Sequence, residues 1–218
     1  MKKIIAKIFS PWGLVPLIMA LLCNFAVYSG WNALTRNWNL HSLAIPLDKQ
    51  IPLIPWTIVI YFGCYIFWII GYLYNAAMDK RHCYRFLMAD WLAKAVCFIC
   101  YVVYPTTNTR PEIVGSDIWA QLMRFLYSMD AADNLFPSIH CLVSWLCYIG
   151  IRGNKKVPQW IRTTFCICAI AVFISTLTTK QHVIYDVVAG VALVEVTYRV
   201  SKLIVKRLVK KEKSNTEA

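Results

Sequence analysis

The stretch TTKQHVIYDVVAG, residues 178–190, places a polar turn directly before a long apolar run. Within it His182 and Asp186 are four residues apart, so on a helix they lie on one face, where the carboxylate can reach the imidazole. A histidine oriented by an acid is suited to nucleophilic or acid–base chemistry. An aspartate inside an apolar span is costly unless it has a role. This pair is therefore the first candidate for a functional site.

The composition indicates a membrane protein rather than a soluble domain. Of the 218 residues, 59% are hydrophobic and 16% are charged, whereas a soluble domain typically has about 25% charged residues. The apolar residues gather into runs long enough to cross a bilayer as helices. The sequence therefore predicts an all-α, polytopic membrane protein, a six-transmembrane-helix bundle. The predicted spans cover roughly residues 11–29, 55–74, 88–104, 137–151, 160–177 and 184–204.

The chain shows no division into domains. No linker rich in Ser and Gly, no long block of charge and no internal repeat interrupts it. We expect one membrane-embedded domain over residues 1–218, with its main motifs within 104–190 and a basic cytoplasmic tail over 202–218. The first 29 residues resemble a signal peptide, but no clean cleavage site follows, which favours an uncleaved first span.

The positive charges are distributed unevenly across the predicted membrane. With a cytoplasmic N-terminus, 17 Lys and Arg residues fall inside and 5 outside, while Lys94 lies within a span. This excess follows the positive-inside rule, so both termini are expected in the cytoplasm. Topology thus accounts for the net charge of +12, which disfavours nucleic acid as a partner. The basic tail is expected to contact anionic lipid headgroups, and the short, Lys-rich, single-domain chain favours a bacterial plasma membrane.

The nine cysteines do not form a metal-binding or redox pattern. Most are scattered through the apolar spans, and the CxxC of Cys97 and Cys100 has no second ligand pair. We therefore interpret the cysteines as small buried apolar residues. No cofactor is expected, and the sequence gives no indication of an oligomeric state.

A second polar motif, in NLFPSIHCLVSW (residues 134–145), opens the fourth predicted span. Pro137 suits the first position of a helix, where its missing N–H costs nothing, so Ser138 and His140 would fall in the first turn. A helix start offers free N–H groups and partial positive charge, which favour a phosphate. Ser138 adds a hydroxyl donor, and His140 can carry a proton.

The predicted topology brings further polar residues to the same membrane face. The fourth and sixth spans both enter from outside, so His140 and His182 would start helices on one side. Arg110 follows the third span on that side, and Lys180 precedes His182 by two residues. Arg binds phosphate through two hydrogen bonds and Lys as a point charge. Each residue alone could be an interfacial end group, but their joint placement favours a site.

The motifs FPSIH and KQHVIYD, with TRP upstream (residues 109–111), resemble those of the phosphatidic acid phosphatase type 2 superfamily of integral membrane lipid phosphatases. The spacing within KQHVIYD is also similar to a related branch of lipid phosphotransferases, which includes sphingomyelin and inositol-phosphorylceramide synthases. The resemblance covers roughly residues 104–190 in motif order, and the six-helix layout extends it to the whole chain.

The resemblance implies a role for each matching residue. His182 would be the nucleophile that forms a phosphohistidine, Asp186 would orient it, and His140 would protonate the leaving oxygen. The family needs no metal. The phosphoryl oxygens would be held by Arg110, Ser138 and the backbone of Ile139.

The chain departs from the family pattern at three positions. Val103 stands where a lysine usually precedes the Arg–Pro pair, Ile139 replaces a glycine, and Thr176 replaces an arginine. Two expected cations are therefore absent. Lys180 could replace one of them, as a basic residue near the nucleophile does in the phosphotransferase branch.

Three functions remain open at this level. The first is hydrolysis of a lipid phosphomonoester or diphosphate, such as phosphatidic acid, phosphatidylglycerol phosphate or polyprenyl diphosphate, at the outer leaflet. The second is transfer of a phospho-headgroup to a lipid alcohol. The third is an inactive fold that binds or moves lipids, with Glu195 and Arg199 lining a polar path. For that pair and for Asp90 with Lys94, structural pairing is the favoured interpretation.

Overall fold

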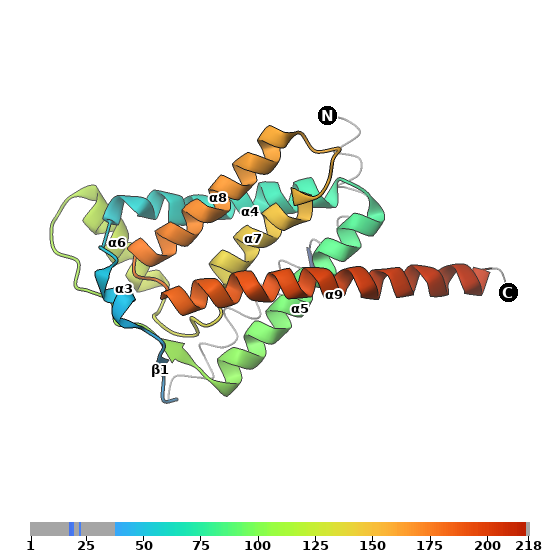
Figure 1. Ribbon diagram of the computed structural model, residues 1–218. Coiled ribbons are helices and arrows are strands. Elements are labelled where there is room, and N and C mark those ends of the chain that lie inside the picture. Colours follow the sequence, from blue (N-terminus) through green and yellow to red (C-terminus); the bar gives the residue numbers. More distant parts are fainter. Residues whose placement is uncertain (1–17, 20–21, 23–37, 217–218) are drawn as a thin grey trace.

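The computed structural model describes residues 18, 19, 22 and 38–216, with side chains described as far as residue 208. The first predicted span, 11–29, therefore lies almost entirely outside the described residues. The described part is a bundle of helices with one small parallel strand pair (Figure 1). Its elements are β1 (His41–Ser42), α3 (Pro46–Gln50), the 3₁₀ turn η1 (Pro55–Thr57), α4 (Ile58–Ala76), α5 (Lys80–Val103), β2 (Thr106–Thr107), α6 (Ile118–Met129), α7 (Ile139–Arg152), α8 (Gln159–Thr178) and α9 (Ile184–Thr216).

Three helices of the described part are long and apolar enough to cross a membrane: Pro55–Ala76, Lys80–Val103 and Gln159–Thr178. Helix α7 is apolar but shorter, at 14 residues. Helix α9 carries Asp186, Glu195 and Arg199 in its first half. The structure is thus mostly helical, with the small strand pair as an exception to the all-α prediction. It supports a membrane protein through three candidate spans, and the count of six is not confirmed.

Two helix boundaries differ from the prediction for identifiable reasons. Helix α5 begins at Lys80 rather than at residue 88, because the Asp79 side chain accepts a hydrogen bond from the N–H of His82 at 2.9 Å and caps the helix. Helix α9 continues from the predicted end at residue 204 to Thr216. The residues beyond 204 include many Lys, Arg and Glu, which favour helix even outside the apolar span.

The bundle has two distinct ends. The histidine end comprises the starts of α4, α7 and α9 and the ends of α5 and α8 (left in Figure 1). Backbone hydrogen bonds join these segments: Ile54 N–H donates to Thr178 O and Ser138 N–H donates to Asp186 O, each at 3.0 Å. Residues 178–186 are therefore held against the starts of both α4 and α7.

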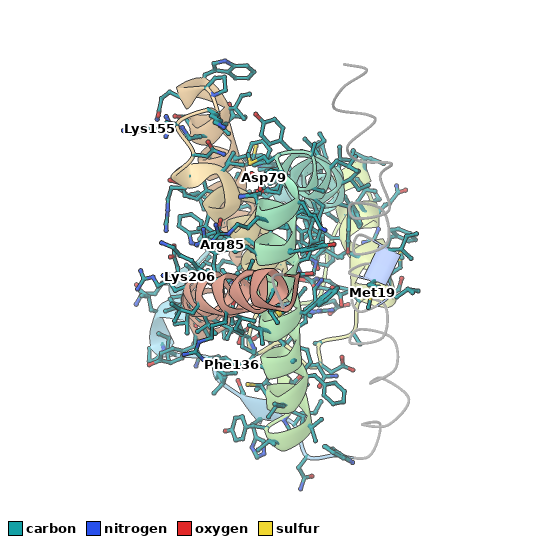
Figure 2. The ribbon with its side chains drawn as sticks, turned by 90° about the vertical axis from the view of Figure 1, so that its right-hand side faces the viewer. Met19, Asp79, Arg85, Phe136, Lys155 and Lys206 are labelled. Atoms are coloured by element: carbon teal, nitrogen blue, oxygen red, sulfur yellow. The ribbon has the colours of Figure 1, made fainter. Side chains whose placement is uncertain are left out.

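The basic end comprises the starts of α5 and α8, the end of α7 and the later part of α9. There Arg85 Nη2 donates to Tyr198 O at 3.3 Å and Arg162 Nη1 donates to Arg152 O at 3.2 Å. Figure 2 views the molecule from this end, with Asp79, Arg85, Lys155 and Lys206 among the labelled residues. The charge distribution predicts that this end faces the cytoplasm.

The segment 105–136, which lies between two predicted spans, contains a helix. Asp117 caps α6 by accepting from the N–H groups of Trp119 and Ala120. The apolar face of α6 packs Met123 against α4 at the histidine end, in one buried cluster with Ile58 and Tyr61. The prediction missed α6 because the polar residues on either side of it dominate the segment.

Helices α7 and α9 approach closely at the histidine end. A Cβ atom at Gly190 would lie 2.6 Å from the carbonyl oxygen of Ser138, so only glycine allows the two backbones to meet here. This approach places the start of α9 directly beside the start of α7, which is the position of the two histidine motifs.

Candidate active site

His182 and Asp186 form a contact at the start of α9. Nδ1 of His182 lies 3.3 Å from Oδ2 of Asp186, and the same oxygen accepts from the N–H of Val183 at 3.0 Å. The side chains are 7% and 1% exposed. The helix begins only at Ile184, so His182 lies in the turn before α9 and not on one helix face with Asp186. The carboxylate reaches back from the first turn to hold both the imidazole and the turn.

The turn before α9 depends on the end of α8. The N–H groups of Gln181 and His182 both donate to the carbonyl of Thr176, at 3.0 and 3.1 Å. Thr176 is the position where the family pattern has an arginine, and here its side chain is buried with Oγ1 donating to Phe173 O. At this position the chain therefore supplies a backbone acceptor for the turn that carries His182 rather than a cation.

His140 lies opposite His182. It occupies the first turn of α7, and the two imidazole centroids are 5.7 Å apart. Tyr61 packs against the other side of His140 at 4.6 Å between centroids, and its hydroxyl donates to Asp130 Oδ2 at 2.7 Å. Trp68 also contacts the His140 ring, at 5.4 Å. The aromatic side chains of α4 thus fix the plane of His140.

Ser138 caps α7 rather than lying inside it. Its Oγ accepts from the N–H of Cys141 at 3.3 Å, so the helix begins at Ile139 and Pro137 precedes it, contrary to the prediction that Pro137 is the first helical residue. The N–H groups of Ile139 and His140 are the first of the helix, and a helix leaves these without an internal acceptor. The helix start therefore still offers donors beside the His140 ring.

Arg110 links three segments at the histidine end. Nη1 donates to Asp130 O, and Nη2 donates to Ala131 O at 3.3 Å and to Gln181 Oε1 at 2.6 Å. Its guanidinium lies over the ring of Tyr127 at 4.9 Å. Arg110 thus lies next to Gln181, the residue before His182. The Nε of its guanidinium has no hydrogen-bond acceptor.

Gln181 is a member of the site that sequence reasoning did not identify. Its side chain is fully buried, its Oε1 accepts from Arg110, and its Nε2 has no hydrogen-bond partner. Its position directly before His182 was the only available signal. The contact with Arg110 makes it part of the same group of donors.

Lys180 is not brought to the histidine pair. Its ammonium donates to the carbonyl oxygens of Asp48 (3.1 Å) and Ile51. Burial lowers the pKa of the Lys180 ammonium, and the Asp48 carboxylate opposes this shift. Asp48 also caps α9 from a distance, since its Oδ1 accepts from the N–H of Ile184 at 2.8 Å. Lys180 therefore fastens α3 to the turn before α9, and no sequence signal predicted this link.

Buried polar atoms without partners gather around the two histidines. Within the described part of the chain, buried atoms lacking a hydrogen-bond partner include Nε2 of His140, Nε2 of Gln181, Nε of Arg110 and Oδ1 of Asp186. Buried polar groups in native proteins are nearly always paired. Three of these atoms can donate, so this arrangement suits a bound anion. Val103, by contrast, is 74% exposed and has no place in the group.

A family profile described as the PAP2 superfamily matches residues 32–200. The match covers more than half of the chain, so the chain belongs to the PAP2 superfamily, as the motifs predicted. Members of this superfamily are generally phosphatases, which indicates a phosphatase-type function. No curated protein and no solved structure matches the chain significantly.

Proposed function

We propose that the protein is a metal-independent lipid phosphatase that works through a phosphohistidine at the extracytoplasmic membrane face. The substrate class is a phosphomonoester or diphosphate of a lipid, such as phosphatidic acid, phosphatidylglycerol phosphate or polyprenyl diphosphate. The observation that carries the proposal is the position of two nearly buried imidazoles 5.7 Å apart, with a carboxylate behind one of them.

In the first step His182 attacks phosphorus. With its proton on Nδ1, the ring donates to Asp186 and keeps the Nε2 lone pair for the attack. The P–N bond forms as the bond from phosphorus to the lipid oxygen breaks. The ring gains positive charge, which the Asp186 carboxylate stabilises.

His140 supplies the proton for the leaving group. In its imidazolium form it donates from Nε2 to the departing lipid oxygen and becomes neutral. Water then attacks phosphorus, the P–N bond breaks, and His140 takes the proton from that water. Inorganic phosphate leaves, and both histidines return to their starting states.

The donors around the pair stabilise charge on the transferring phosphoryl group. Arg110, Gln181, Ser138 and the first N–H groups of α7 are fixed by the surrounding contacts, so they need little reorganisation when charge develops. Electrostatic stabilisation of this kind is usually the largest contribution to phosphoryl transfer.

The direct test is His182→Ala in purified protein supplied with each of the three lipid phosphates. We expect the turnover number to fall by at least about 10³-fold, because the nucleophile is lost. Substantial residual hydrolysis would refute the assignment. His41→Ala is the matched control, since His41 stacks on Tyr104 outside the site and its loss should leave turnover within about twofold of wild type.

A second candidate, transfer of the phosphoryl or phospho-headgroup to a lipid alcohol, is favoured by one observation. His140 and His182 are only 5% and 7% exposed, and a covered intermediate can exclude water in favour of an acceptor. Donor lipid labelled at phosphorus separates the two reactions. Label in inorganic phosphate supports hydrolysis, and label in a new lipid supports transfer.

A further inference from the structure

The basic end of the bundle contains a second polar site, far from the histidines. A pocket of about 200 Å³ lies between α7 and α8. Because it opens at the last turn of α7 and His140 lies in the first, the two sites are separated by the length of that helix, roughly 18 Å at 1.5 Å per residue. The pocket is lined by Tyr148, Arg152, Gln159, Arg162, Thr163, Cys166 and Ile167.

The donors of this pocket are only partly used. Arg162 Nη1 donates to the carbonyl of Arg152, while its Nε is buried and has no hydrogen-bond partner. Arg152 is held by Glu195 through contacts of 2.6 and 3.1 Å. The carboxylate balances one guanidinium, so the charge of Arg162 is left for a ligand. The pocket therefore offers a positive charge and an oriented donor. Beside them, Gln159 Nε2 donates to Thr163 Oγ1 at 3.3 Å, which leaves the Thr163 hydroxyl and the second amide N–H of Gln159 as further donors.

An apolar stripe leads away from the pocket along α8. Ile167, Ile170 and Ile174 are 61%, 44% and 53% exposed, and their spacing places them near one another on a single helix face. Trp160, 70% exposed near the start of α8, is the type of residue that marks a membrane interface. Polar donors at the interface, continued by an apolar surface into the membrane, match the two parts of a phospholipid.

We propose that this pocket binds the phosphate of an anionic phospholipid from the leaflet opposite the histidine pair, with the acyl chains along the stripe of α8. Arg162 contacts the phosphate, and Gln159 and Thr163 contact its oxygens or the headgroup. The shared chemistry is a phosphate anion, so a free phosphate is the competing source. The isoleucine stripe favours the lipid, because a free anion gains nothing from it. The site does not depend on the proposed catalytic function.

The test is native mass spectrometry of the full chain. The protein is released from micelles that contain phosphatidylglycerol and phosphatidylcholine in equal amounts. Wild type is expected to retain phosphatidylglycerol in preference to phosphatidylcholine. Arg162→Gln is expected to lower the retained phosphatidylglycerol about tenfold, since a charge-assisted contact is lost. Arg162→Lys, which keeps the charge but loses the Nε donor, should give an intermediate loss and guards against a folding defect in the first variant.

Lys155→Gln is the matched control. Lys155 is exposed in the connection between α7 and α8, so this variant removes one positive charge at the same end without touching the pocket. It should retain phosphatidylglycerol within about twofold of wild type. Equal retention in Arg162→Gln and Lys155→Gln would overturn the proposal. Displacement of the lipid by inorganic phosphate at millimolar concentration would also overturn it, because the ligand would then be the free anion.

Discussion

Two acid–base pairs in this chain share a spacing of four residues but lie in different surroundings. In α5 the Asp90 carboxylate and the Lys94 ammonium are 2.6 Å apart, and both side chains are fully buried. At the start of α9 His182 and Asp186 are 3.3 Å apart, and the His182 ring faces a second imidazole. In the first pair the two charges balance each other within α5, and the Lys94 ammonium also donates to the hydroxyl of Tyr72 on α4 at 3.4 Å. In the second pair the histidine ring lies 5.7 Å from a ring on another helix.

The difference shows that spacing alone does not distinguish a structural pair from a reactive one. Asp90 and Lys94 lie inside a regular helix, α5, whose apolar residues pack in one buried cluster with residues of α4, α7 and α9. Asp186 also holds the N–H of Val183 and so fixes the turn that carries His182. The pair at a helix start, facing a residue from a second helix start, is the one for which we propose chemistry.

Asp186→Asn should give the largest effect among changes to these pairs. The amide cannot stabilise the positive charge that His182 gains on attack, so we expect kcat to fall by about 10²–10³-fold with little change in KM. The measurement is steady-state hydrolysis of a lipid phosphate in micelles. An unchanged kcat would show that the carboxylate only shapes the turn.

Lys94→Met tests the structural pair. It leaves the Asp90 carboxylate buried without its counter-charge, so we expect a loss of about 3–5 kcal/mol in stability, measured by denaturation in detergent. The double variant Asp90→Leu with Lys94→Met should recover most of that loss. The folded fraction of each variant should keep the wild-type kcat. If the stability losses of the two single changes were strictly additive in the double variant, Asp90 and Lys94 would not be a coupled pair.

Gln181→Met should have a smaller effect on catalysis. It removes the buried donor and the contact with Arg110, so we expect kcat/KM to fall about tenfold. Asn108→Leu is the matched control, because Asn108 donates to the carbonyl of Lys180 in the same turn but has no part in the donor group. If both variants lose the same activity, Gln181 acts only by holding the turn.

Asp48→Ala should have the smallest effect. It removes the distant cap of α9, which costs about 1 kcal/mol of stability, and loosens the turn that carries His182. Thermal unfolding in detergent should show the lower stability, and kcat should change by less than about fivefold. A loss of kcat as large as that of Asp186→Asn would place Asp48 in the catalytic machinery instead.

The sequence predicted the parts of the molecule that depend on local pattern. Apolar runs located the helices α4, α5, α7, α8 and α9, and the predicted topology indicated that His140 and His182 belong together. The contacts that arrange the site were not predictable in this way. Asp48 and Ile184 are far apart in sequence, and their hydrogen bond depends on how the segment of α3 folds back over α9.

The role of Lys180 also depended on tertiary structure. A position two residues before His182 made Lys180 a reasonable ligand for phosphate. The backbone at Lys180, however, has a positive φ of 58°, which directs the side chain out of the turn toward α3. Gln181, with an uncharged side chain, is the residue that the turn presents beside Arg110.

The hydrogen bond from Ser138 N–H to Asp186 O ties the beginning of one histidine-bearing helix to the beginning of the other. This bond resists a tilt of one helix start against the other, so it helps to keep the 5.7 Å separation of the two imidazole centroids. In the proposed reaction the two histidines would therefore already be in register before a lipid phosphate binds.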